Sequence, residues 1–337
     1  MKIILEYVWI DAFDNQRSKI KIINSHDFYI SLNDCPTWNF DGSSTEQASG
    51  HDSDVILNPV RLYTNPFYEN KTSYLVLCEC LDKSFNPHIT NKRRECQNTF
   101  YKYKEYECLF GIEQEYILFD RTHKPYNWLE HHNPGCGEQG PYYCSVGGDR
   151  NFGRQISNEH LLLCINAGIN ICGTNSEVMP SQWEFQIGTC DILTVCDDLI
   201  MARYILHRVS EKYDCYVSYN PKPFSEWNGS GGHTNFSTLQ MRSNDGILYI
   251  YKACEKLKAN HENHIKIYGS DNEKRLTGLH ETSSINDFSY SVANRGASIR
   301  IPFTVFNDGC GYLEDRRPAA NLNPYLVTNI IVNTVLN

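Results

Sequence analysis

The chain has 337 residues, of which 41% are apolar and 21% charged, and its formal net charge is −9. This composition is typical of a globular protein with enough apolar side chains for a sizeable core. The negative charge argues against nucleic acid as the main partner and is compatible with a site that collects metal cations. No uncharged run approaches the roughly 18 residues that a membrane-spanning helix needs, so we expect no membrane partner.

Fourteen cysteines are scattered along the chain without a CxxC pair or the spacing of a zinc site. We interpret them as small buried thiols in a reducing compartment. The first 13 residues are apolar but carry Glu6 and Asp11 and lack a small-residue cleavage site, which favours a first strand over a signal peptide. These observations predict a cytoplasmic protein.

Short strands are predicted over the first part of the chain, at residues 7–10, 19–22 and 74–78. A polar loop rich in glycine and serine is expected at 39–45. Asn86-Pro87-His88 then marks an expected boundary between a domain of residues 1–87 and a domain of residues 88–337.

Three helices are predicted after this boundary. Thr90 is expected to cap a helix from 91 to about 106, and Ser157 to cap one that ends near Gly168. A longer helix, from 191 to 212, carries an apolar stripe at helical spacing that indicates burial. The sequence therefore predicts an α+β fold, with a small N-terminal domain and a larger mixed one.

Two glutamates flank one glutamine in the segment 110–119, which is otherwise apolar and aromatic enough to be a buried strand. Residues two apart on a strand point to the same face, so Glu113 and Glu115 would project side by side, roughly 6–7 Å apart. This spacing suits two separate hard cations better than one, and buried carboxylates require a positive partner. For this segment taken alone, a half-exposed strand with a polar face is the alternative.

A second carboxylate pair lies in the segment 173–188, where Met179 to Gln182 is a candidate turn between two strands. In a four-residue hairpin loop, Glu177 and Glu184 would be cross-strand neighbours about 5 Å apart. Like charges that face each other destabilise a sheet unless a cation lies between them. A solvated hairpin edge is the alternative.

The segment 227–237 is rich in glycine and contains His233, a natural imidazole ligand. Its glycines permit close approach of the backbone to a ligand, but the run lacks both GxGxxG and a following lysine, so it is weak evidence for phosphate binding. A purely structural histidine is the alternative.

Five arginines follow within about fifty residues, and their planar forks can bind phosphate or carboxylate through two bonds at once. They are Arg275, Arg295, Arg300, Arg316 and Arg317. Surface ion pairs are the default interpretation of any single arginine. Several arginines beside an acidic metal site instead predict a clamp for phosphoryl transfer.

Taken together, these segments resemble glutamine synthetase of the eukaryotic type, from about Tyr7 to near the C-terminus. The segments that carry the resemblance are 38–44, 110–116, 139–144, 177–188, 228–237, 275–282 and 314–321. The resemblance implies a β-grasp-like domain over 1–87 and a catalytic domain over 88–337, with a curved antiparallel sheet flanked by helices. It also implies ATP-dependent ligation of ammonia to L-glutamate, which gives L-glutamine, ADP and phosphate through γ-glutamyl phosphate.

The same resemblance implies two sites for Mg²⁺ or Mn²⁺ in addition to the co-substrate ATP. Glu115, Glu177 and Glu184 would hold one cation beside the glutamate carboxylate and the ammonia site. Glu113, His233 and Glu314 would hold the other, which binds ATP phosphates.

Substrate contacts are implied residue by residue. Asn228, Gly229, Arg275 and Arg316 would contact glutamate. Arg295 and Arg300 would face the transferring phosphate, and Asn235, Phe236 and Ser237 would lie along the nucleotide. Arg295 and Arg316 would also contribute to catalysis.

In the resembling family, Asp41 and Ser44 belong to the active site of the neighbouring subunit. Asp41 would then be the candidate general base for ammonium, and Glu281 would close the pocket as a mobile flap. An active site that includes a loop of the neighbouring subunit implies a ring of subunits, and eukaryotic members of the family stack two rings of five subunits.

Two departures from the family pattern are visible. Leu109 stands where tryptophan is usual, and Glu226 replaces an asparagine. Both bear on substrate affinity, the first at the adenine and the second near the glutamate pocket. Two alternatives remain: a ligase that joins glutamate to a different amine, and a catalytically silent structural homologue.

Overall fold

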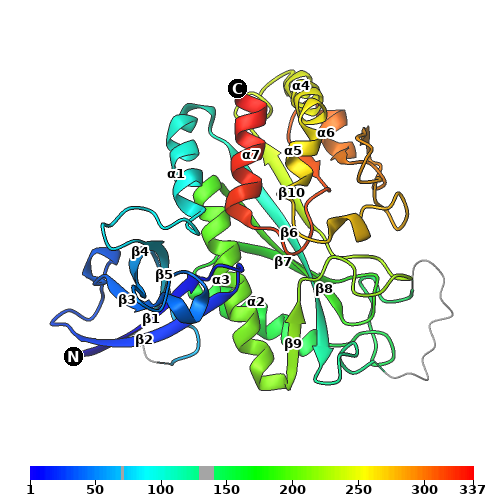
Figure 1. Ribbon diagram of the computed structural model, residues 1–337. Helices are drawn as coiled ribbons and strands as arrows, with labels where there is room; N and C mark the ends of the chain where they lie inside the picture. Colours follow the sequence, from blue (N-terminus) through cyan, green and yellow to red (C-terminus); the bar gives the residue numbers. More distant parts are fainter. Residues whose placement is uncertain (70–71, 129–139) are drawn as a thin grey trace.

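The computed structural model describes residues 1–69, 72–128 and 140–337, and the chain folds around two β-sheets (Figure 1). One sheet has five strands and the other has eight. Gln139, which belongs to one of the segments that carry the resemblance, lies outside the described residues. The expected boundary at 86–88 falls between the last strand of the first sheet and the first helix, and the division into two domains stays a prediction.

The N-terminal sheet has the strand order β2-β1-β5-β4-β3. Its strands are β1 (Lys2–Ile10), β2 (Gln16–Asn24), β3 (Trp38–Asp41), β4 (Asp54–Thr64) and β5 (Ser73–Leu81). Neighbours are antiparallel except for the parallel pair β1–β5. The predicted strands at 7–10, 19–22 and 74–78 are confirmed, since they lie within β1, β2 and β5.

The larger sheet has the order β11-β12-β13-β10-β6-β8-β7, and β9 pairs with the far end of β6. Its strands are β6 (Leu109–Asp120), β7 (Ile171–Ser176), β8 (Gln182–Asp191), β9 (Cys215–Ser218), β10 (Gly232–Ser237), β11 (Tyr290–Val292), β12 (Ile299–Ile301) and β13 (Leu313–Asp315). All its pairs are antiparallel except β11–β12. The expected sheet, flanked by helices, is confirmed, and β6 lies in its middle.

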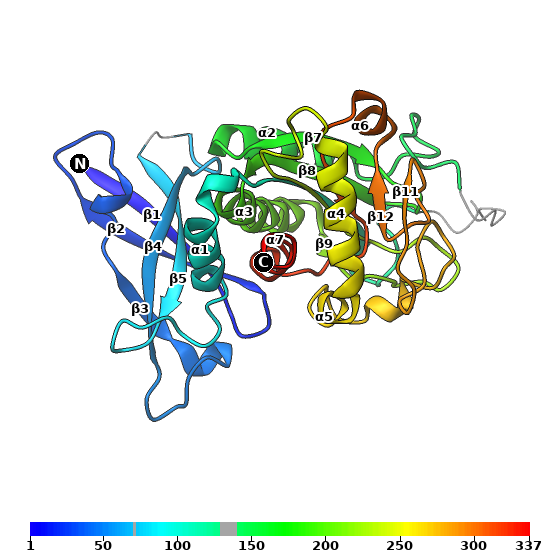
Figure 2. The same cartoon turned by 90° about the horizontal axis from the view of Figure 1, so that it is seen from above.

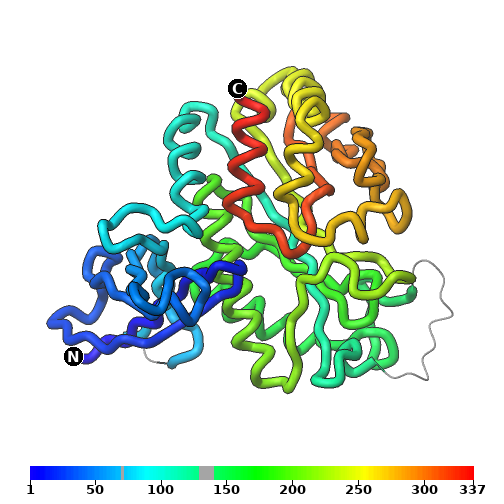
Figure 3. Tube along the Cα trace, viewed as in Figure 1, coloured from blue at the N-terminus to red at the C-terminus, as the bar shows by residue number. Residues whose placement is uncertain are grey.

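Seven helices cover these sheets in the described part of the chain. They are α1 (Arg93–Lys102), α2 (Arg154–Ala167), α3 (Ile192–Ser210), α4 (Gly246–Ala259), α5 (His261–Ile265), α6 (Phe303–Asp308) and α7 (Pro324–Leu336). Viewed from above, α1, α3 and α7 lie between the N-terminal sheet and the larger sheet (Figure 2). The tube in Figure 3 shows that the chain ends far from where it starts, with the C-terminus at the end of α7. None of the helices described here combines the length and apolar composition needed to cross a membrane.

The predicted helix at 191–212 is confirmed as α3. Asp191 caps it, because its carboxylate accepts from the backbone N–H groups of Leu193 and Thr194 at 3.0 Å each. The last residues, Glu211–Tyr213, form a 3₁₀ turn instead of a further α-helical turn. The apolar stripe is buried in the core between the two sheets, as its spacing indicates.

Two predicted caps are wrong. Thr90 accepts a hydrogen bond from Gln47 Nε2 at 2.8 Å, and Asn91 accepts from the backbone N–H of Arg94 at 3.3 Å at the start of α1 instead. Ser157 lies one turn inside α2, where its hydroxyl is 2.8 Å from that of Thr174, and the helix begins after Gly153. In both cases a tertiary partner takes the hydroxyl that the local pattern assigns to a cap. The predicted helix end at Gly168 is confirmed.

The expected loop at 39–45 is also partly wrong. Residues 38–41 form β3, because Phe40 is buried against Trp9 and its backbone pairs with that of Val55. Only Gly42–Thr45 turns, as a short 3₁₀ helix that Asp41 caps.

One apolar core joins the two sheets. It contains Val8, Tyr63, Leu75 and Leu77 from the N-terminal sheet together with most of α3 and the inner face of the larger sheet. A second, smaller core covers the other face of the N-terminal sheet. The two parts of the chain therefore share buried surface.

A buried carboxylate reinforces this junction. Asp198 on α3 accepts from the Tyr63 hydroxyl at 2.8 Å, and Arg61 Nη2 lies 3.4 Å from it. The backbone N–H and the side-chain amide of Asn170 also donate to Asp198, at 3.1 and 2.7 Å. Both oxygens of this carboxylate are thus used, and Oδ1 binds across the junction.

We expect Asp198→Ala to lower the free energy of unfolding by about 3 kcal/mol, because it leaves Tyr63, Arg61 and Asn170 without their acceptor. Urea unfolding followed by circular dichroism measures this. Asp149→Ala is the matched control, since Asp149 pairs only with exposed Arg150, and we expect a change within about 0.5 kcal/mol. Equal effects of the two substitutions would contradict the prediction.

Candidate active site

The alternation of β6 separates a polar face from a core face. Gln114 and Tyr116 point into the protein and are fully buried, whereas Glu113 and Glu115 line a cavity of about 210 Å³ on the other side. The predicted strand and its paired carboxylates are thus present in the structure. Glu115 is buried and Glu113 is half-buried.

Most residues singled out in the sequence meet at this cavity. Its walls include Glu113, Glu115, Glu177, Glu184, Asn228, Gly229, His233, Arg275, Glu281, Arg295, Arg300, Glu314 and Arg316. They come from segments between 113 and 316, and antiparallel pairing of β6 with β8 and β10 brings these segments together.

Glu115, Glu177 and Glu184 form a first cluster, in which one carboxylate oxygen from each lies within 4.8 Å of the others. Glu115 and Glu184 are direct partners across β6 and β8. The third carboxylate comes from the connection between β7 and β8. The three therefore converge because two adjacent strands and one loop meet.

The predicted hairpin register is wrong. Asn175, not Glu177, pairs with Glu184, and Ser176 pairs with Trp183. The connection is longer than a four-residue turn: the Glu177 N–H donates to Gln182 O at 2.8 Å, and Ser181 has a left-handed φ of 59°. Glu177 still reaches the cluster, but from the loop.

The first cluster is electrostatically strained as it stands. Burial, opposed by the Gly231 N–H, raises the pKa of Glu115 to about 7, and burial together with the Glu115 charge raises the pKa of Glu177 to about 8. Burial and the neighbouring carboxylates raise the pKa of Glu184 well above its ordinary value. Among the described residues, no lysine or arginine forms an ion pair with these three carboxylates. Their hydrogen-bond donors are neutral: Gly231 N, Asn175 Nδ2 and Gln186 Nε2.

Such a donor set fits a divalent cation. Three buried carboxylates within reach of one another repel unless a positive charge lies between them, and oxygen ligands suit hard cations. Asn175 and Gln186 were not singled out in the sequence. Gln186 lies two residues from Glu184 on β8, so the period of two along a strand is the signal that finds it. Asn175 is the partner of Glu184 across β7 and β8, which depends on the register of the hairpin.

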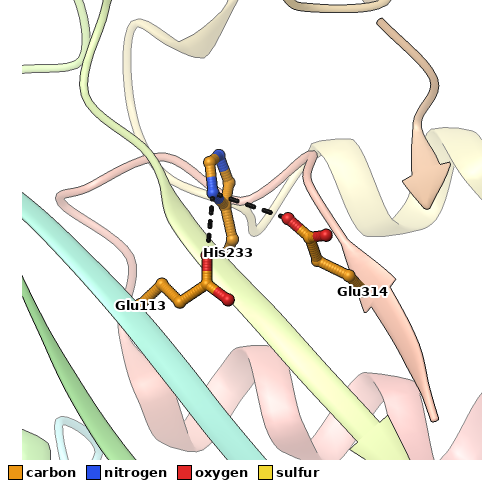
Figure 4. A group of neighbouring side chains, drawn as sticks. All are labelled: Glu113, His233 and Glu314. Atoms are coloured by element: carbon orange, nitrogen blue, oxygen red, sulfur yellow. Dashed lines mark ion pairs between the residues drawn. The ribbon is translucent and has the colours of Figure 1, made fainter. Parts of the chain in front are cut away.

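Glu113, His233 and Glu314 form the second cluster, from β6, β10 and β13. Their ligand atoms also lie within 4.8 Å of one another. His233 Nδ1 is 3.5 Å from Glu113 Oε2 and 3.8 Å from Glu314 Oε1, so the ring nitrogen faces both carboxylates (Figure 4). Strand pairing sets this arrangement, since Glu113 is the direct partner of His233 across β6 and β10.

The second cluster also fits a cation. Burial, and then the charge of Arg316, hold the pKa of His233 well below its usual range, so the imidazole is neutral and has a lone pair to offer. Glu314 differs from the other carboxylates, because Arg300 Nη1 and Arg316 Nη1 donate to it at 2.8 and 2.6 Å. The first cluster thus has three carboxylates, whereas the second has two carboxylates, one of them bound by two arginines, and a neutral imidazole.

The arginines fall into two groups. Arg300 and Arg316 face the cavity, and Arg295 lies beside them with its guanidinium 3.6 Å from Glu281. Arg317 points the other way and makes a fully buried pair with Asp315. Arg317 is therefore not part of the expected clamp, because residues alternate in direction along β13 and its continuation.

Arg275 forms the floor of the cavity near the glycine-rich segment. Burial lowers its pKa to about 10. Its Nη2 donates to three backbone carbonyls, of Arg316, Arg317 and Pro318, at 2.8–3.0 Å. A Cβ on Gly229 would lie 2.6 Å from Arg275 Cγ, so only glycine allows this approach.

Asn228 precedes that glycine and lines the cavity. Its Oδ1 is buried and, among the described residues, accepts no hydrogen bond. A buried acceptor without a donor is costly. It therefore fits a ligand that brings N–H groups into the cavity.

A second cavity, of about 370 Å³ and mostly apolar, adjoins the first through Glu113 and Gln186. Asn235, Phe236 and Ser237 line it, as does Leu109. Asn235 Nδ2 donates to Glu113 Oε1 at 2.9 Å, which links this cavity to the second cluster. The apolar lining suits a flat ring system.

The loop 276–285 forms the rim of the first cavity. A hydrogen bond from Ile285 N to Leu276 O, 2.8 Å long, closes its base. His280 and Glu281 at its tip both have left-handed backbone, with φ of 53° and 61°. Glu281 and His280 both line the cavity.

Asp41 and Ser44 are not brought to either cavity. Asp41 ends β3 and Ser44 lies in the 3₁₀ helix that follows it, and the Asp41 carboxylate accepts from the hydroxyls of Ser43 and Ser44 at 2.6 and 2.8 Å. These hydrogen bonds, with that of the Ser43 side chain foremost, lower the pKa of the exposed Asp41. Glu226 is likewise exposed and absent from the cavity walls.

Comparison with known proteins identifies the family. The family model "Glutamine synthetase, beta-Grasp domain" matches residues 2–83, and "Glutamine synthetase, catalytic domain" matches residues 92–256. Proteins named glutamine synthetase from Candida glabrata and Saccharomyces cerevisiae are 51% and 50% identical over 335 residues, covering 99% of this chain and 89% of each relative. One from Agaricus bisporus is 49% identical over 336 residues, covering 99% of this chain and 94% of the relative.

The fold is shared with a solved structure as well. A cryo-electron microscopy structure of Plasmodium falciparum glutamine synthetase matches with a TM-score of 0.76 at 18% identity, over 99% of this chain and 71% of that one. Since the two family models together match more than half of the chain and the fungal relatives align over nearly all of it, this protein belongs to the glutamine synthetase family, of the eukaryotic type.

Proposed function

We propose that the chain is a glutamate–ammonia ligase, which joins ammonia to L-glutamate at the expense of ATP and yields L-glutamine, ADP and phosphate. The observation that carries the proposal is the pairing of two acidic clusters, each with one glutamate from β6, in a cavity that four arginines also line. Acidic metal ligands and arginines together are what phosphoryl transfer onto a carboxylate requires. The fungal relatives, all named glutamine synthetase, support the same reaction.

Glu115, Glu177 and Glu184 would hold one Mg²⁺ or Mn²⁺, and Glu113, His233 and Glu314 a second. When bound, these cations supply neutralisation of the charge that spreads over the phosphoryl oxygens. Which of the two metals is preferred depends on cavity size and ligand number.

The protein side chains position the first step. Arg275 lines the cavity, its Nε and Nη2 are held by Asn272 and backbone carbonyls, and its Nη1 would bind the glutamate α-carboxylate. Asn228 Oδ1 and the backbone at Gly229 accept the amino group. The γ-carboxylate of glutamate then attacks the γ-phosphate of ATP, while Arg295, Arg300 and Arg316 bind the oxygens of the moving group.

The nucleotide base would occupy the second, apolar cavity along Asn235, Phe236 and Ser237. This places the phosphates near Glu113, which both cavities share. Leu109 provides one apolar wall for the base.

Ammonium enters beside Glu177 and Glu281 and loses a proton before it attacks γ-glutamyl phosphate. Asp41 of the neighbouring subunit is the proposed base. Its pKa is lowered in the isolated chain, so contact with the neighbour's carboxylates must raise its proton affinity. Glu281 excludes water that would hydrolyse the intermediate.

The position of Asp41 supports a ring of subunits, because this residue lies outside the cavity of its own chain. We propose a decamer of two five-membered rings with active sites between adjacent subunits. The thirteen described cysteines are all free thiols, which agrees with a cytoplasmic location.

The decisive assay measures glutamate-dependent ATP hydrolysis with ammonium and, separately, with alkylamines, and identifies the amide product. We expect glutamine with ammonium and little product with alkylamines. Dependence on an alkylamine would instead identify a ligase for another amine. No amide from any amine would leave a catalytically silent homologue.

We expect Arg316→Ala to lower kcat at least 10³-fold, because an arginine aimed at a phosphoryl-transfer transition state is worth about 10³–10⁵ in rate. Steady-state kinetics with saturating ATP and glutamate test this. Arg150→Ala, which removes an exposed arginine paired with Asp149, is the control and should keep wild-type kcat. A fall of less than tenfold in Arg316→Ala would argue against its role.

We expect Glu281→Ala to release more phosphate per glutamine formed, because the opened rim lets water reach the intermediate. Phosphate and glutamine are measured in the same reaction, with and without ammonium. Glu273→Ala alters an exposed glutamate just before the loop and should leave the ratio at its wild-type value. An unchanged ratio in Glu281→Ala would remove the flap role.

Cation binding should become more stabilising as pH rises from 6 to 9. The pKa values of Glu115 and Glu177, about 7 and 8, exceed their ordinary value of 4.5. The metal-free fold therefore keeps this contribution to stability below pH 4.5 and loses it as pH rises through 7 and 8, by about 1.4 kcal/mol per pH unit for each proton. A bound cation replaces those protons.

Melting curves with EDTA and with excess Mg²⁺ across this range measure the effect. The gap in Tm between the two conditions should widen with pH, and Glu177→Gln should narrow it at pH 9. A gap that is independent of pH would contradict the assignment of the first cluster.

A further inference from the structure

A buried guanidinium lies directly behind the two acidic clusters. Arg203, on α3, is 5% exposed and sits on the core side of β6. Its Nε donates to Gln114 Oε1 at 2.9 Å, and its Nη2 donates to the same oxygen. Gln114 is the residue between Glu113 and Glu115, so the contact is made at the point where the clusters share a strand.

The remaining donors of Arg203 bind the segment that follows Arg316 and Arg317. Nη2 donates to Ala320 O at 3.0 Å and Nη1 donates to Leu322 O at 2.9 Å. The Gln114 amide completes the bridge, because its Nε2 donates to Ala320 O at 2.9 Å and to Glu115 O at 2.8 Å. One fork therefore joins β6 to residues 320–322.

That segment in turn holds the glycine-rich strand of the site. Ala320 N donates to Ser230 O at 3.0 Å, and Gly232 N donates to Pro318 O at 3.0 Å. Gly231 N then donates to Glu115 Oε2 at 2.7 Å. The segments that carry Glu115, His233 and Arg316 are thus connected through Arg203 and Gln114.

Arg203, like Arg275, is buried without a carboxylate partner among the described residues. Arg93 and Arg317, which are also buried, instead bind Asp197 and Asp315 through two bonds each. Arg203 binds only an amide and two carbonyls, and burial lowers its pKa. The ring of Tyr219, 5.0 Å from its guanidinium, adds a cation–π contact.

A guanidinium without an ion pair is costly to bury, and a neutral side chain of the same length cannot present its planar fork. The free-energy cost of burying Arg203 is compatible with a role that only a planar guanidinium provides. That role is to hold β6, residues 320–322 and the glycine-rich segment at fixed distances from one another.

We propose that Arg203, acting through Gln114, is a positioning residue that sets the separation of the two divalent-cation sites. It touches neither substrate nor cation. The inference rests on the proposed function, because it requires that both clusters bind metal.

Mn²⁺ titration tests this, with electron paramagnetic resonance to follow free Mn²⁺ and the magnetic coupling between bound ions. Full-length wild type, Arg203→Met, Arg203→Lys and Arg93→Met are compared after near-ultraviolet circular dichroism confirms folding. Arg93→Met is the matched control: it removes another buried arginine, on α1, whose partner Asp197 lies on α3 and binds Tyr325 of α7, so the contact includes no residue of β6.

Wild type should bind two coupled Mn²⁺ per subunit. Arg203→Met should raise the Kd of the weaker site at least tenfold and abolish the magnetic coupling. Arg93→Met should lower Tm but keep the wild-type Kd values and the magnetic coupling. Arg203→Lys keeps the charge but not the fork, so it should raise the same Kd at least threefold.

Two coupled ions with wild-type affinity in Arg203→Met would overturn the inference, even if Tm falls. Should that variant not fold, Arg203→Lys decides: wild-type Kd and coupling would overturn the inference, and a raised Kd would support it. Fewer than two ions in wild type would overturn the metal assignment itself, and the inference with it.

Discussion

Repulsion between buried carboxylates is the constraint around which the larger sheet is organised. β6, β8 and β13, with the β7–β8 connection, present five glutamates to one cavity, while Tyr116, Phe185 and other large side chains fill the opposite side. Because side chains alternate along a strand, neither set can move without the other. The apolar core therefore holds the acidic groups in positions that they would not adopt by themselves.

The two clusters resolve this repulsion differently. In the first, the hydrogen-bond donors are uncharged and the carboxylates hold protons more tightly than usual. In the second, two arginines bind Glu314 and a neutral imidazole completes the set. A cation that enters the second cluster meets charge already partly neutralised, so the two sites should differ in affinity. Phosphate oxygens, which bind both metal and arginine, suit the second cluster better than the first.

Period-two patterns were the most reliable guide from the sequence. They identified β6, the paired glutamates and the core face of β8, because each depends only on alternation. The β7–β8 register was mispredicted, since the backbone of Glu177 and Ser181 widens the connection in a way the residue types do not reveal. The hydroxyls of Thr90 and Ser157 were assigned to helix caps, although tertiary partners take them.

The candidate site shows the same contrast between what the sequence pattern predicts and what depends on tertiary contacts. The resemblance to the family gathered residues far apart in sequence, and nearly all of them line one cavity. Which of two adjacent arginines faces the cavity could not be read from the sequence: Arg316 faces the cavity and Arg317 faces Asp315. Alternation along β8 points to the amide of Gln186, whereas that of Asn175 depends on the β7–β8 register. Gln114 and Arg203 required the structure, because α3 approaches β6 only in three dimensions.

The shared core between the two sheets limits how this chain can be recombined. Val8, Tyr63, Leu75 and Leu77 pack into the same interior as α3, and Asp198 binds Tyr63 across the boundary. A chimera that takes its first 87 residues from a distant homologue would have to match these shapes and this hydrogen bond at once. We therefore expect substitutions in the first 87 residues to be compensated by substitutions in the rest of the chain where the two parts pack together, so that the two parts are not interchangeable between homologues.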